Sequence, residues 1–337
     1  MEAEKKEDKK DDKKAGRKAF PRLSFSFIKI LTGSDLSNRR LPIMVAKGEK
    51  PGPTVWLTGC AHGDEVDAIV VIQEIFKILK KSPLLKGTLY AFPIMNPIGF
   101  ETISRQVTLS EEDLNRSFPG NEKGSLAERI AYKIFATIIN TKPALVLDLH
   151  SSWRGSVPYA FIDKDEKITN RDAYEKTKVF AKKSGFLTVY EADILEQSLT
   201  FSLINKGIPA LTIELGESYV VNEKNVEYGV KSVLNILSYL EMTEPQEEFV
   251  YPTLPAAFEG KTICYSDKPF SSTSGIIRFL VKTGDIVKKG QPLAKIYNTF
   301  GRLLETMIAS DDCVILGFSD FSVAFPGGLV IVVGIIK

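Results

Sequence analysis

The stretch TVWLTGCAHGDEVD, residues 54–67, decides how this chain folds. It opens with a short apolar run rich in β-branched and aromatic residues and reaches Gly59, a pattern typical of a buried strand. A tight loop carrying His62 follows, and we expect a helix to begin near Glu65. At a strand-to-helix corner, an imidazole and a carboxylate three residues apart can face one point in space.

A second histidine, His150, ends another apolar run, LVLDLHSS at residues 145–152. His62 and His150 are the only histidines of the chain. Together with Glu65 they predict a metal site with one position left open for water, which is the ligand set of several catalytic zinc hydrolases. Imidazoles and a carboxylate suit Zn²⁺, one per chain, although another divalent ion could use the same ligands. The simpler alternative is two backbone-bonded histidines and a Glu65 that caps its own helix.

Strand-like and helix-like segments alternate through most of the chain. We expect strands at residues 88–94, 145–152, 158–162, 187–190 and 208–215, and helices at residues 66–79, 125–139, 165–185, 197–205 and 222–240. Residues 48–53 are expected to form a turn, and residues 99–120 a long polar loop. The alternation predicts an α/β fold with a mixed sheet flanked by helices. Ligands of such sheets bind beyond the carboxyl ends of the strands, where His62 and His150 are expected.

The two ends of the chain have a different composition. Residues 1–20 mix lysines with acidic residues and are expected to form a disordered charged tail, so that the catalytic domain spans residues 21–244. Residues 245–255 are predicted to be a linker, and residues 256–337 a smaller all-β domain packed on the catalytic one. The segment SGIIRFLVKTGDIVKKGQPLAKI, residues 274–296, resembles a biotinyl/lipoyl-like β-barrel. Residues 297–301, where such carriers place their modified lysine, contain none, so a carrier role is disfavoured.

Three motifs together resemble a known family. HGDE at residues 62–65, DLNRSFPG at 113–120 and DLHSS at 148–152 follow one another as in the succinylglutamate desuccinylase/aspartoacylase family, which has a zinc carboxypeptidase-like fold. The similarity covers roughly residues 25–241. It implies zinc bound by His62, Glu65 and His150.

The same resemblance implies roles for further residues. Glu214, in TIELGE, matches the general base, with Glu217 as a nearby competitor for that role. Asn115 and Arg116 match the pair that holds the substrate carboxylate, and Arg116 also matches the residue that polarises the scissile carbonyl. Arg105 resembles a second arginine that contacts the acyl end.

Two neighbouring acidic residues are expected to act indirectly. Asp113 is expected to support its loop, and Asp148 could orient His150 from behind. A Ser-His-Asp mechanism at Ser151 or Ser152 is excluded, because no histidine would remain to activate the serine.

Composition sets further bounds. The net charge of +2 gives no indication of nucleic acid or of an anionic membrane as a partner. The most apolar run, residues 327–336, is far below spanning length, and Met1–Lys18 lacks the apolar core of a signal peptide. Three widely spaced cysteines suit a reducing compartment, so we expect a cytoplasmic location.

The sequence therefore predicts a zinc-dependent amidohydrolase that cleaves the amide bond of a small N-acylated amino acid. The alternatives are a metallocarboxypeptidase on the same fold and a non-catalytic metal- or ligand-binding protein. A small, capped pocket would favour the deacylase, and the C-terminal β domain points that way. The acyl group, the amino acid and the oligomeric state stay open, and a homo-oligomer is one option for the last.

Overall fold

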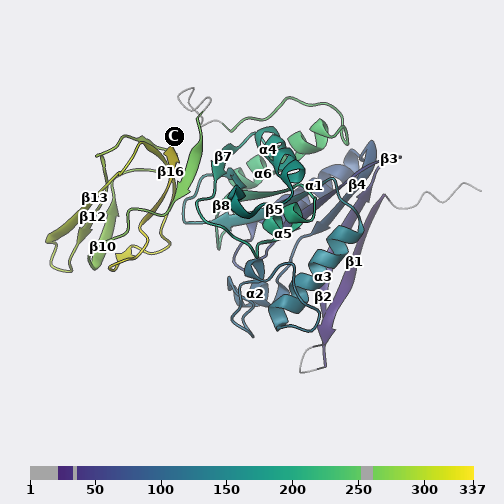
Figure 1. Ribbon diagram of the computed structural model, residues 1–337, viewed down its shortest axis with the longest axis horizontal. Helices are drawn as coiled ribbons and strands as arrows, with labels where there is room; N and C mark the ends of the chain where they lie inside the picture. Colours follow the sequence, from purple (N-terminus) through teal and green to yellow (C-terminus); the bar gives the residue numbers. More distant parts are fainter. Residues whose placement is uncertain (1–21, 33–35, 252–260) are drawn as a thin grey trace, which may run out of the picture.

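The computed structural model of the protein describes residues 22–32, 36–251 and 261–337, and its largest element is a twelve-stranded sheet. The strand order across this sheet is β1-β2-β4-β3-β5-β8-β6-β7-β9-β16-β14-β11 (Figure 1). Its strands are β1 (Leu23–Thr32), β2 (Asn38–Lys47), β3 (Lys50–Gly59), β4 (Lys86–Phe92), β5 (Leu145–Ser152), β6 (Tyr159–Ile162), β7 (Leu187–Tyr190), β8 (Ala210–Glu217), β9 (Ile263–Ser266), β11 (Ile286–Val287), β14 (Cys313–Phe318) and β16 (Ile331–Ile336). A four-stranded sheet, in the order β13-β12-β10-β15, contains β10 (Gly275–Phe279), β12 (Pro292–Tyr297), β13 (Leu303–Ile308) and β15 (Val323–Ala324).

The large sheet is mixed, as predicted. Its central strands β4, β3, β5 and β8 are parallel neighbours, whereas β1 and β2 pair antiparallel at one edge. Strand β6 runs antiparallel to β8 and parallel to β7. The parallel core places the carboxyl ends of β3, β5 and β8 at one edge of the sheet, where ligands of such folds bind.

Helices cover both faces of the central strands. The helices are α1 (Asp67–Lys81), α2 (Pro97–Thr102), α3 (Leu126–Asn140), α4 (Arg171–Lys183), α5 (Leu199–Asn205) and α6 (Glu223–Tyr239), with 3₁₀ turns η1 (Leu114–Arg116) and η2 (Asp165–Lys167). On one face of β8, the Thr212 hydroxyl donates to the hydroxyl of Thr200 in α5. On the other face, a Cβ atom added at Gly229 of α6 would lie 2.6 Å from Leu215 and 2.8 Å from Val71 of α1. Glycine thus lets α6 pack closely onto β8 and α1.

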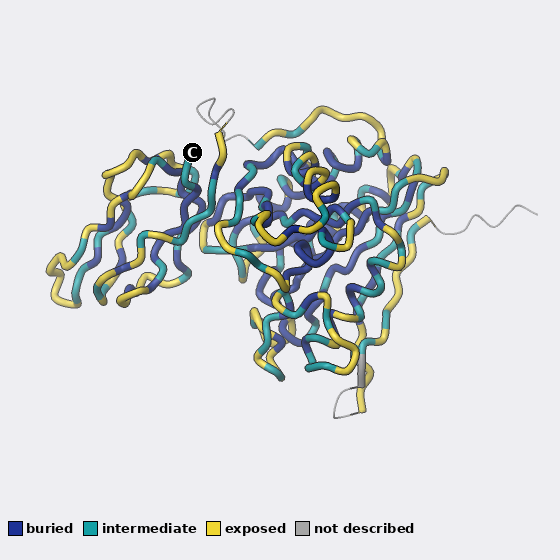
Figure 2. The backbone as a smooth tube through the Cα atoms, in the orientation of Figure 1, coloured by how far each residue is buried: buried dark blue, intermediate teal, exposed yellow. Residues whose placement is uncertain are grey.

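The core is centred on β3. Val55, Trp56 and Leu57 are fully buried, as the apolar run predicts for a strand covered on both faces. Trp56 stacks on Tyr90 of β4, with ring centroids 4.9 Å apart, and its Nε1–H donates to Thr141. Burial of side chains this large contributes about 1.5–3 kcal/mol each. Figure 2 shows the buried strands running through the middle of the larger part of the molecule.

Most elements lie where the sequence predicts them, and the capping box of α3 at Ser125 and Glu128 is present. The expected helix over residues 165–185 is wrong in its first third, because η2 ends at Lys167 and α4 begins after an Asn170 cap. The turn expected over 48–53 is shorter, since β3 already begins at Lys50. The expected loop over 99–120 contains most of α2 and all of η1.

The C-terminal segment continues the large sheet. Strand β9 pairs parallel with β7 and antiparallel with β16, so backbone hydrogen bonds join the two parts of the chain side by side (Figure 1). Before it, the backbone of Phe249 exchanges two hydrogen bonds with the Asn235 side chain, which holds this part of the expected linker on α6. The domain boundaries stay a prediction, and the charged tail and the end of the linker lie outside the described residues.

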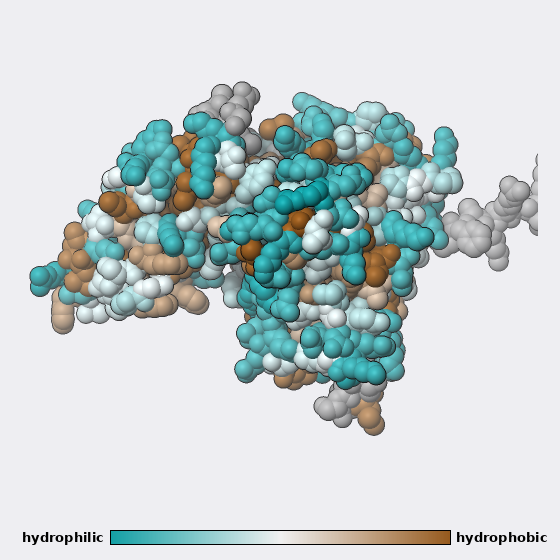
Figure 3. Space-filling view, in the orientation of Figure 1, coloured by the Kyte–Doolittle hydropathy of each residue, from teal (hydrophilic) through white to brown (hydrophobic). Residues whose placement is uncertain are grey.

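Two observations concern the surface. Among the helices of the described residues, none combines the length and the apolar character that crossing a membrane requires. On the face drawn in Figure 3, hydrophilic residues predominate and the hydrophobic patches are small and separated.

Candidate metal centre and active site

Both proposed ligands of the first motif lie in the loop between β3 and α1. The loop leaves the sheet at Cys60, whose φ of 53° is left-handed and turns the chain sharply. Gly63 then passes so close to α2 that an added Cβ atom would lie 1.9 Å from the backbone of Gly99. The Gly63 amide also donates to the carbonyl of Ser104. This contact fixes the loop that carries His62 and Glu65.

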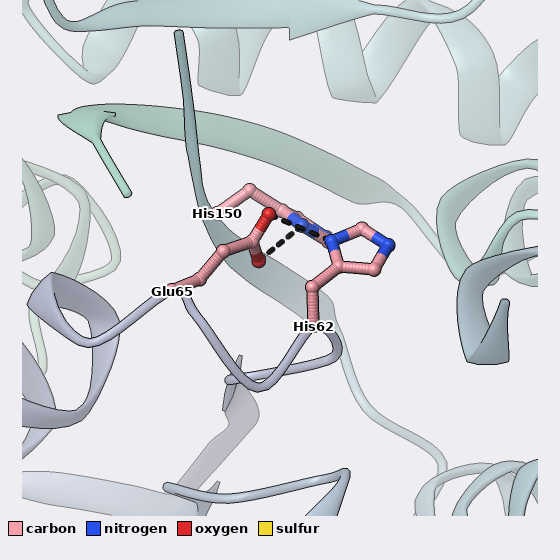
Figure 4. Close-up of side chains that lie close together, drawn as sticks. All are labelled: His62, Glu65 and His150. Atoms are coloured by element: carbon pink, nitrogen blue, oxygen red, sulfur yellow. Dashed lines mark hydrogen bonds and ion pairs between the residues drawn. The ribbon is translucent and has the colours of Figure 1, made fainter. Parts of the chain in front are cut away.

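His62, Glu65 and His150 converge at the carboxyl ends of the strands (Figure 4). The Nδ1 atom of His62 lies 2.7 Å from Oε1 of Glu65, and Nδ1 of His150 lies 2.9 Å from Oε2. Candidate ligand atoms of the three residues all lie within 4.8 Å of one another. Each side chain is at most 3% exposed, so the donors face one another rather than water.

The far nitrogen of each imidazole contacts a carboxylate. Nε2 of His62 lies 3.1 Å from Asp113, and Nε2 of His150 lies 2.9 Å from Asp148. Asp148 also accepts a 2.7 Å hydrogen bond from Thr58. Carboxylate partners of this kind orient the rings of metal-binding histidines and leave Nδ1 available to an ion. The donor set and its supports therefore fit a divalent metal, which agrees with the expectation that Asp148 contacts His150 from behind.

Electrostatic coupling within the cluster is strong. Burial alone would raise the pKa of Glu65, but His62 and His150 lower it to about 2. Burial alone would lower the pKa of His150, but Asp148 and Glu65 hold it well above its usual range. A divalent ion binds neutral imidazoles. Its binding would therefore release the protons held by the imidazoles of the cluster, and metal affinity would increase as pH rises.

Glu214 lies beside the cluster, on β8. It is the register partner of His150 on β5 and of Tyr159 on β6. Its Oε2 atom is buried and has no hydrogen-bond partner among the described residues, and burial raises the pKa of this carboxyl to about 7. Glu217 instead accepts a hydrogen bond from the Gly155 amide. The two competing glutamates therefore differ in position, because Glu214 lines the central cavity and Glu217 does not.

The predicted substrate-binding residues have different surroundings. Asn115 accepts a hydrogen bond from the Leu199 amide and so ties η1 to α5. Arg116 lines the cavity, and within the described residues no carboxylate lies within ion-pair distance of its guanidinium. Arg105 is paired with Asp113 at 2.9 Å, and its other terminal nitrogen lies 3.3 Å from Nδ1 of His62. Arg116 is therefore free to receive an anion, whereas Arg105 already has a partner.

The three proposed metal ligands and Glu214 line one cavity of about 410 Å³, together with Asn115, Arg116 and Arg105. Its wall also contains residues that the sequence did not single out for the site: Trp153, Tyr159, Phe161, Asp163, Glu191 and Tyr265. Tyr265 and Asp320 belong to the C-terminal segment, so this segment forms part of the cavity wall. Asp163 and Glu191 directly follow β6 and β7, which run antiparallel to β8, so the rule for the carboxyl ends of the central strands does not point to them.

The fold and the cavity define a mixed α/β protein with a His-Glu-His cluster at the carboxyl ends of its strands. The chain belongs to the succinylglutamate desuccinylase/aspartoacylase family, because residues 51–240, more than half of its length, match that family's catalytic domain. This confirms the resemblance and the fold class that the motifs predict.

The chain is also similar to individual proteins and solved structures. The chain is 29% identical over 267 residues to an N-alpha-acetyl-L-2,4-diaminobutyric acid deacetylase of Halomonas elongata, covering 77% of this chain and 74% of that protein. A succinylglutamate desuccinylase/aspartoacylase structure from Rhodobacter sphaeroides superposes with a TM-score of 0.78 at 21% identity, covering 94% and 95% of the two chains. A metallo-carboxypeptidase from Burkholderia cenocepacia superposes with a TM-score of 0.54 at 13% identity over 65% of each chain. These two structures show the shared fold.

Proposed function

We propose that this protein is a zinc-dependent hydrolase that cleaves the amide bond of a small N-acylated amino acid. The observation that carries the proposal is the convergence of His62 and His150 on the two oxygens of Glu65, inside a cavity that also contains Glu214 and Arg116. The deacetylase activity named for the relative from Halomonas elongata supports a deacylase over the other hydrolases of this fold.

His62, Glu65 and His150 would hold the metal, one ion per chain, with Asp113 and Asp148 fixing the two imidazoles. A Zn²⁺ ion bound there supplies a Lewis acid that lowers the pKa of bound water to about 7 and polarises a carbonyl. The donors themselves are buried and held in place, so the site is organised before any substrate enters.

Glu214 acts as the general base and then as the acid. Its buried carboxyl has a pKa of about 7, so it can accept a proton from water at neutral pH and later donate it to the leaving amine. Within the described part of the chain, no hydrogen bond competes for its Oε2 atom. The register pairing of Glu214 with His150 supports this role, because it brings the carboxyl close to the proposed metal ligands.

Arg116 binds the substrate's carboxylate. A planar guanidinium pairs with a carboxylate through two parallel hydrogen bonds, and this one has no competing acidic partner among the residues described. Its Nη1–H donates to the Asn115 carbonyl, which holds the arginine at the cavity wall. Asn115 positions the loop through Leu199, and Arg105 acts mainly through Asp113 and His62.

The shape of the site bears on the two alternatives. Tyr265 and Asp320, from the C-terminal segment, close part of the cavity wall, which favours a small substrate over the end of a polypeptide. A non-catalytic binding protein would have no use for a Glu214 whose Oε2 atom is buried and, among the described residues, unbonded beside its metal ligands. Both observations favour the deacylase.

The proposal is tested by amine release from N-acetyl and N-succinyl amino acids, with unblocked peptides included for carboxypeptidase activity. Glu214→Gln should lower kcat by about 10²–10⁴-fold, the usual contribution of a general base, with the metal still bound. Glu217→Gln is the matched control on the same strand and should retain activity. Turnover of peptides alone would move the assignment to a carboxypeptidase, and no turnover of any substrate by the zinc-loaded protein would refute hydrolysis.

A further inference from the structure

A buried carboxylate in the cavity wall has no role in the mechanism above. Asp163 directly follows β6 and is only 8% exposed. The hydroxyl of Thr200 hydrogen-bonds to it, but among the residues that the structure describes no lysine or arginine lies within ion-pair distance. Its neighbour Lys164 pairs instead with Glu166. Burying a carboxylate without a cationic partner costs free energy, so a cation bound beside Asp163 would be stabilised there.

A second carboxyl lies beside it. Glu191 follows β7, the parallel neighbour of β6, and its amide donates to the carbonyl of Ile162, the residue before Asp163. One oxygen of Glu191 accepts hydrogen bonds from the amides of Ala192 and Asp193, which fixes the side chain. Both acids line the same cavity as the metal cluster. The ends of two adjacent strands thus direct two carboxyls to one region of the wall.

Aromatic rings line the cavity next to these acids. Trp153, Tyr159, Phe161 and Tyr265 all contribute to its wall. Phe161 lies 5.6 Å from Tyr159 and 5.4 Å from Tyr265 between ring centroids, and Trp153 donates its Nε1–H to the Tyr265 hydroxyl. Aromatic faces carry partial negative charge and attract ammonium groups. This is an independent feature of the same wall that favours a cation.

The charged groups outside the metal cluster favour a cation as well. Apart from the proposed metal ligands, the cavity lining includes two guanidinium groups, those of Arg105 and Arg116, and five carboxyl groups: Asp64, Asp163, Glu191, Glu214 and Asp320. Arg105 is already paired with Asp113, so only Arg116 can receive a carboxylate. A substrate with a second carboxylate would therefore meet unpaired acids instead of a second free arginine.

We propose that this cavity selects N-acylated amino acids whose side chain ends in an ammonium group, with Asp163 and Glu191 as the carboxylates that determine this specificity. The inference rests on the proposed function and specifies its substrate class. The substrate's α-carboxylate pairs with Arg116, and the side-chain ammonium pairs with Asp163 and Glu191 between the aromatic rings. Arg116 acts electrostatically on both acids, and all three side chains line the same cavity.

The test uses three Nα-acetyl amino acids of matched side-chain length on the zinc-loaded full chain. They are 2,4-diaminobutyrate, norvaline and glutamate, which end in an ammonium, a methyl and a carboxylate group. The cationic substrate should exceed norvaline in kcat/KM by about tenfold or more, and glutamate should be the poorest. Asp163→Asn, an isosteric change, should bring the cation-to-norvaline ratio close to one. Asp193→Asn removes a nearby exposed charge outside the cavity and should leave that ratio unchanged.

Two results would overturn the specificity assignment. One is equal or better turnover of the norvaline or glutamate substrate by the wild type. The other is an unchanged ratio in Asp163→Asn, which would make Asp163 only a support for Arg116. If no acyl amino acid is cleaved, the proposed function fails. The ammonium site is then tested by comparing the calorimetric affinities of free 2,4-diaminobutyrate and free norvaline. Tighter binding of the diamino acid, lost in Asp163→Asn, supports the ammonium site, whereas equal binding refutes it.

Discussion

The Oδ2 atom of Asp148 lies 2.9 Å from Nε2 of His150, while Nδ1 of the same ring contacts Glu65. The two residues are next-but-one neighbours on β5, so strand alternation places their side chains on one face of the sheet. Asp148 therefore contacts the side of the imidazole opposite Glu65 and raises the pKa of His150, and we expect it to orient the ring for metal binding.

Asp148→Asn should weaken zinc binding by about 10–100-fold, because the amide keeps the shape of the carboxylate and loses its charge. The dissociation constant is measured by competition with a chelator of known affinity. Asp320→Asn, which removes a charge from another part of the cavity wall, serves as control and should bind zinc as the wild type does. Equal zinc affinity of Asp148→Asn and the control would show that the contact has no such role.

Arg116→Lys should lower kcat/KM for an N-acyl amino acid by about 10²-fold, mainly through a higher KM. Lysine keeps the positive charge but cannot form two parallel hydrogen bonds with a carboxylate. Arg171→Lys, a change of the same kind at an exposed pair with Asp165, should have no effect on steady-state kinetics. Full activity of Arg116→Lys would mean that the substrate carboxylate binds elsewhere.

Asp163 should make stability depend on pH in a direction opposite to that of most carboxylates. Burial raises the pKa of Asp163 from 3.8 to about 7, so between these values the folded chain binds more protons than the unfolded one. Its contribution to the free energy of unfolding therefore falls as pH rises from about 4 to 7 and is constant above that range.

Asp163→Asn should accordingly stabilise the metal-free protein at pH 8, by on the order of 1–4 kcal/mol, and the gain should vanish near pH 4. Urea unfolding at the two pH values measures it. Asp172→Asn, at an exposed residue of α4, controls for the loss of one negative charge. A wild type that is as stable as Asp163→Asn at pH 8 would show that Asp163 is not strained by burial.

Gly63→Ala should both destabilise the fold and weaken zinc binding. The added Cβ atom would lie 1.9 Å from the Gly99 backbone, so the loop bearing His62 must move. Overpacking of this kind costs about 1–3 kcal/mol, measured by urea unfolding. Gly290→Ala, at a left-handed turn in open space, should cost some stability but leave zinc affinity intact. Unchanged zinc affinity in Gly63→Ala would show that the loop position does not set the site.

Much of the fold and the His-Glu-His cluster can be predicted from the sequence alone, because each depends on local pattern. His62 and His150 follow short apolar runs, and such runs become parallel strands whose carboxyl ends meet at one edge. The capping box at Ser125 and the apolar run before Gly59 are likewise local features. The break between η2 and α4 was missed, because the helical pattern continues across it and only the Asn170 cap marks the true start.

The rest of the site depends on contacts between distant parts of the chain. Tyr265 enters the cavity wall through the pairing of β9 with β7, which no local pattern specifies. The pairing of Arg105 with Asp113, eight residues further along the same loop, also follows from no periodic pattern, and the substrate contact expected of Arg105 stays a prediction. Asp163 has no motif around it, and its importance follows only from its burial in the cavity wall.

The measurement that tests the central claim most directly is the zinc content of the full chain after removal of metal and reconstitution, determined by mass spectrometry for the wild type, His62→Ala, His150→Ala and Glu214→Gln. We predict one zinc per chain in the wild type and in Glu214→Gln, and none in either histidine variant. Folding of each variant is checked by circular dichroism. A wild type that retains no zinc, or folded histidine variants that still bind one ion per chain, would contradict a metal centre at His62, Glu65 and His150.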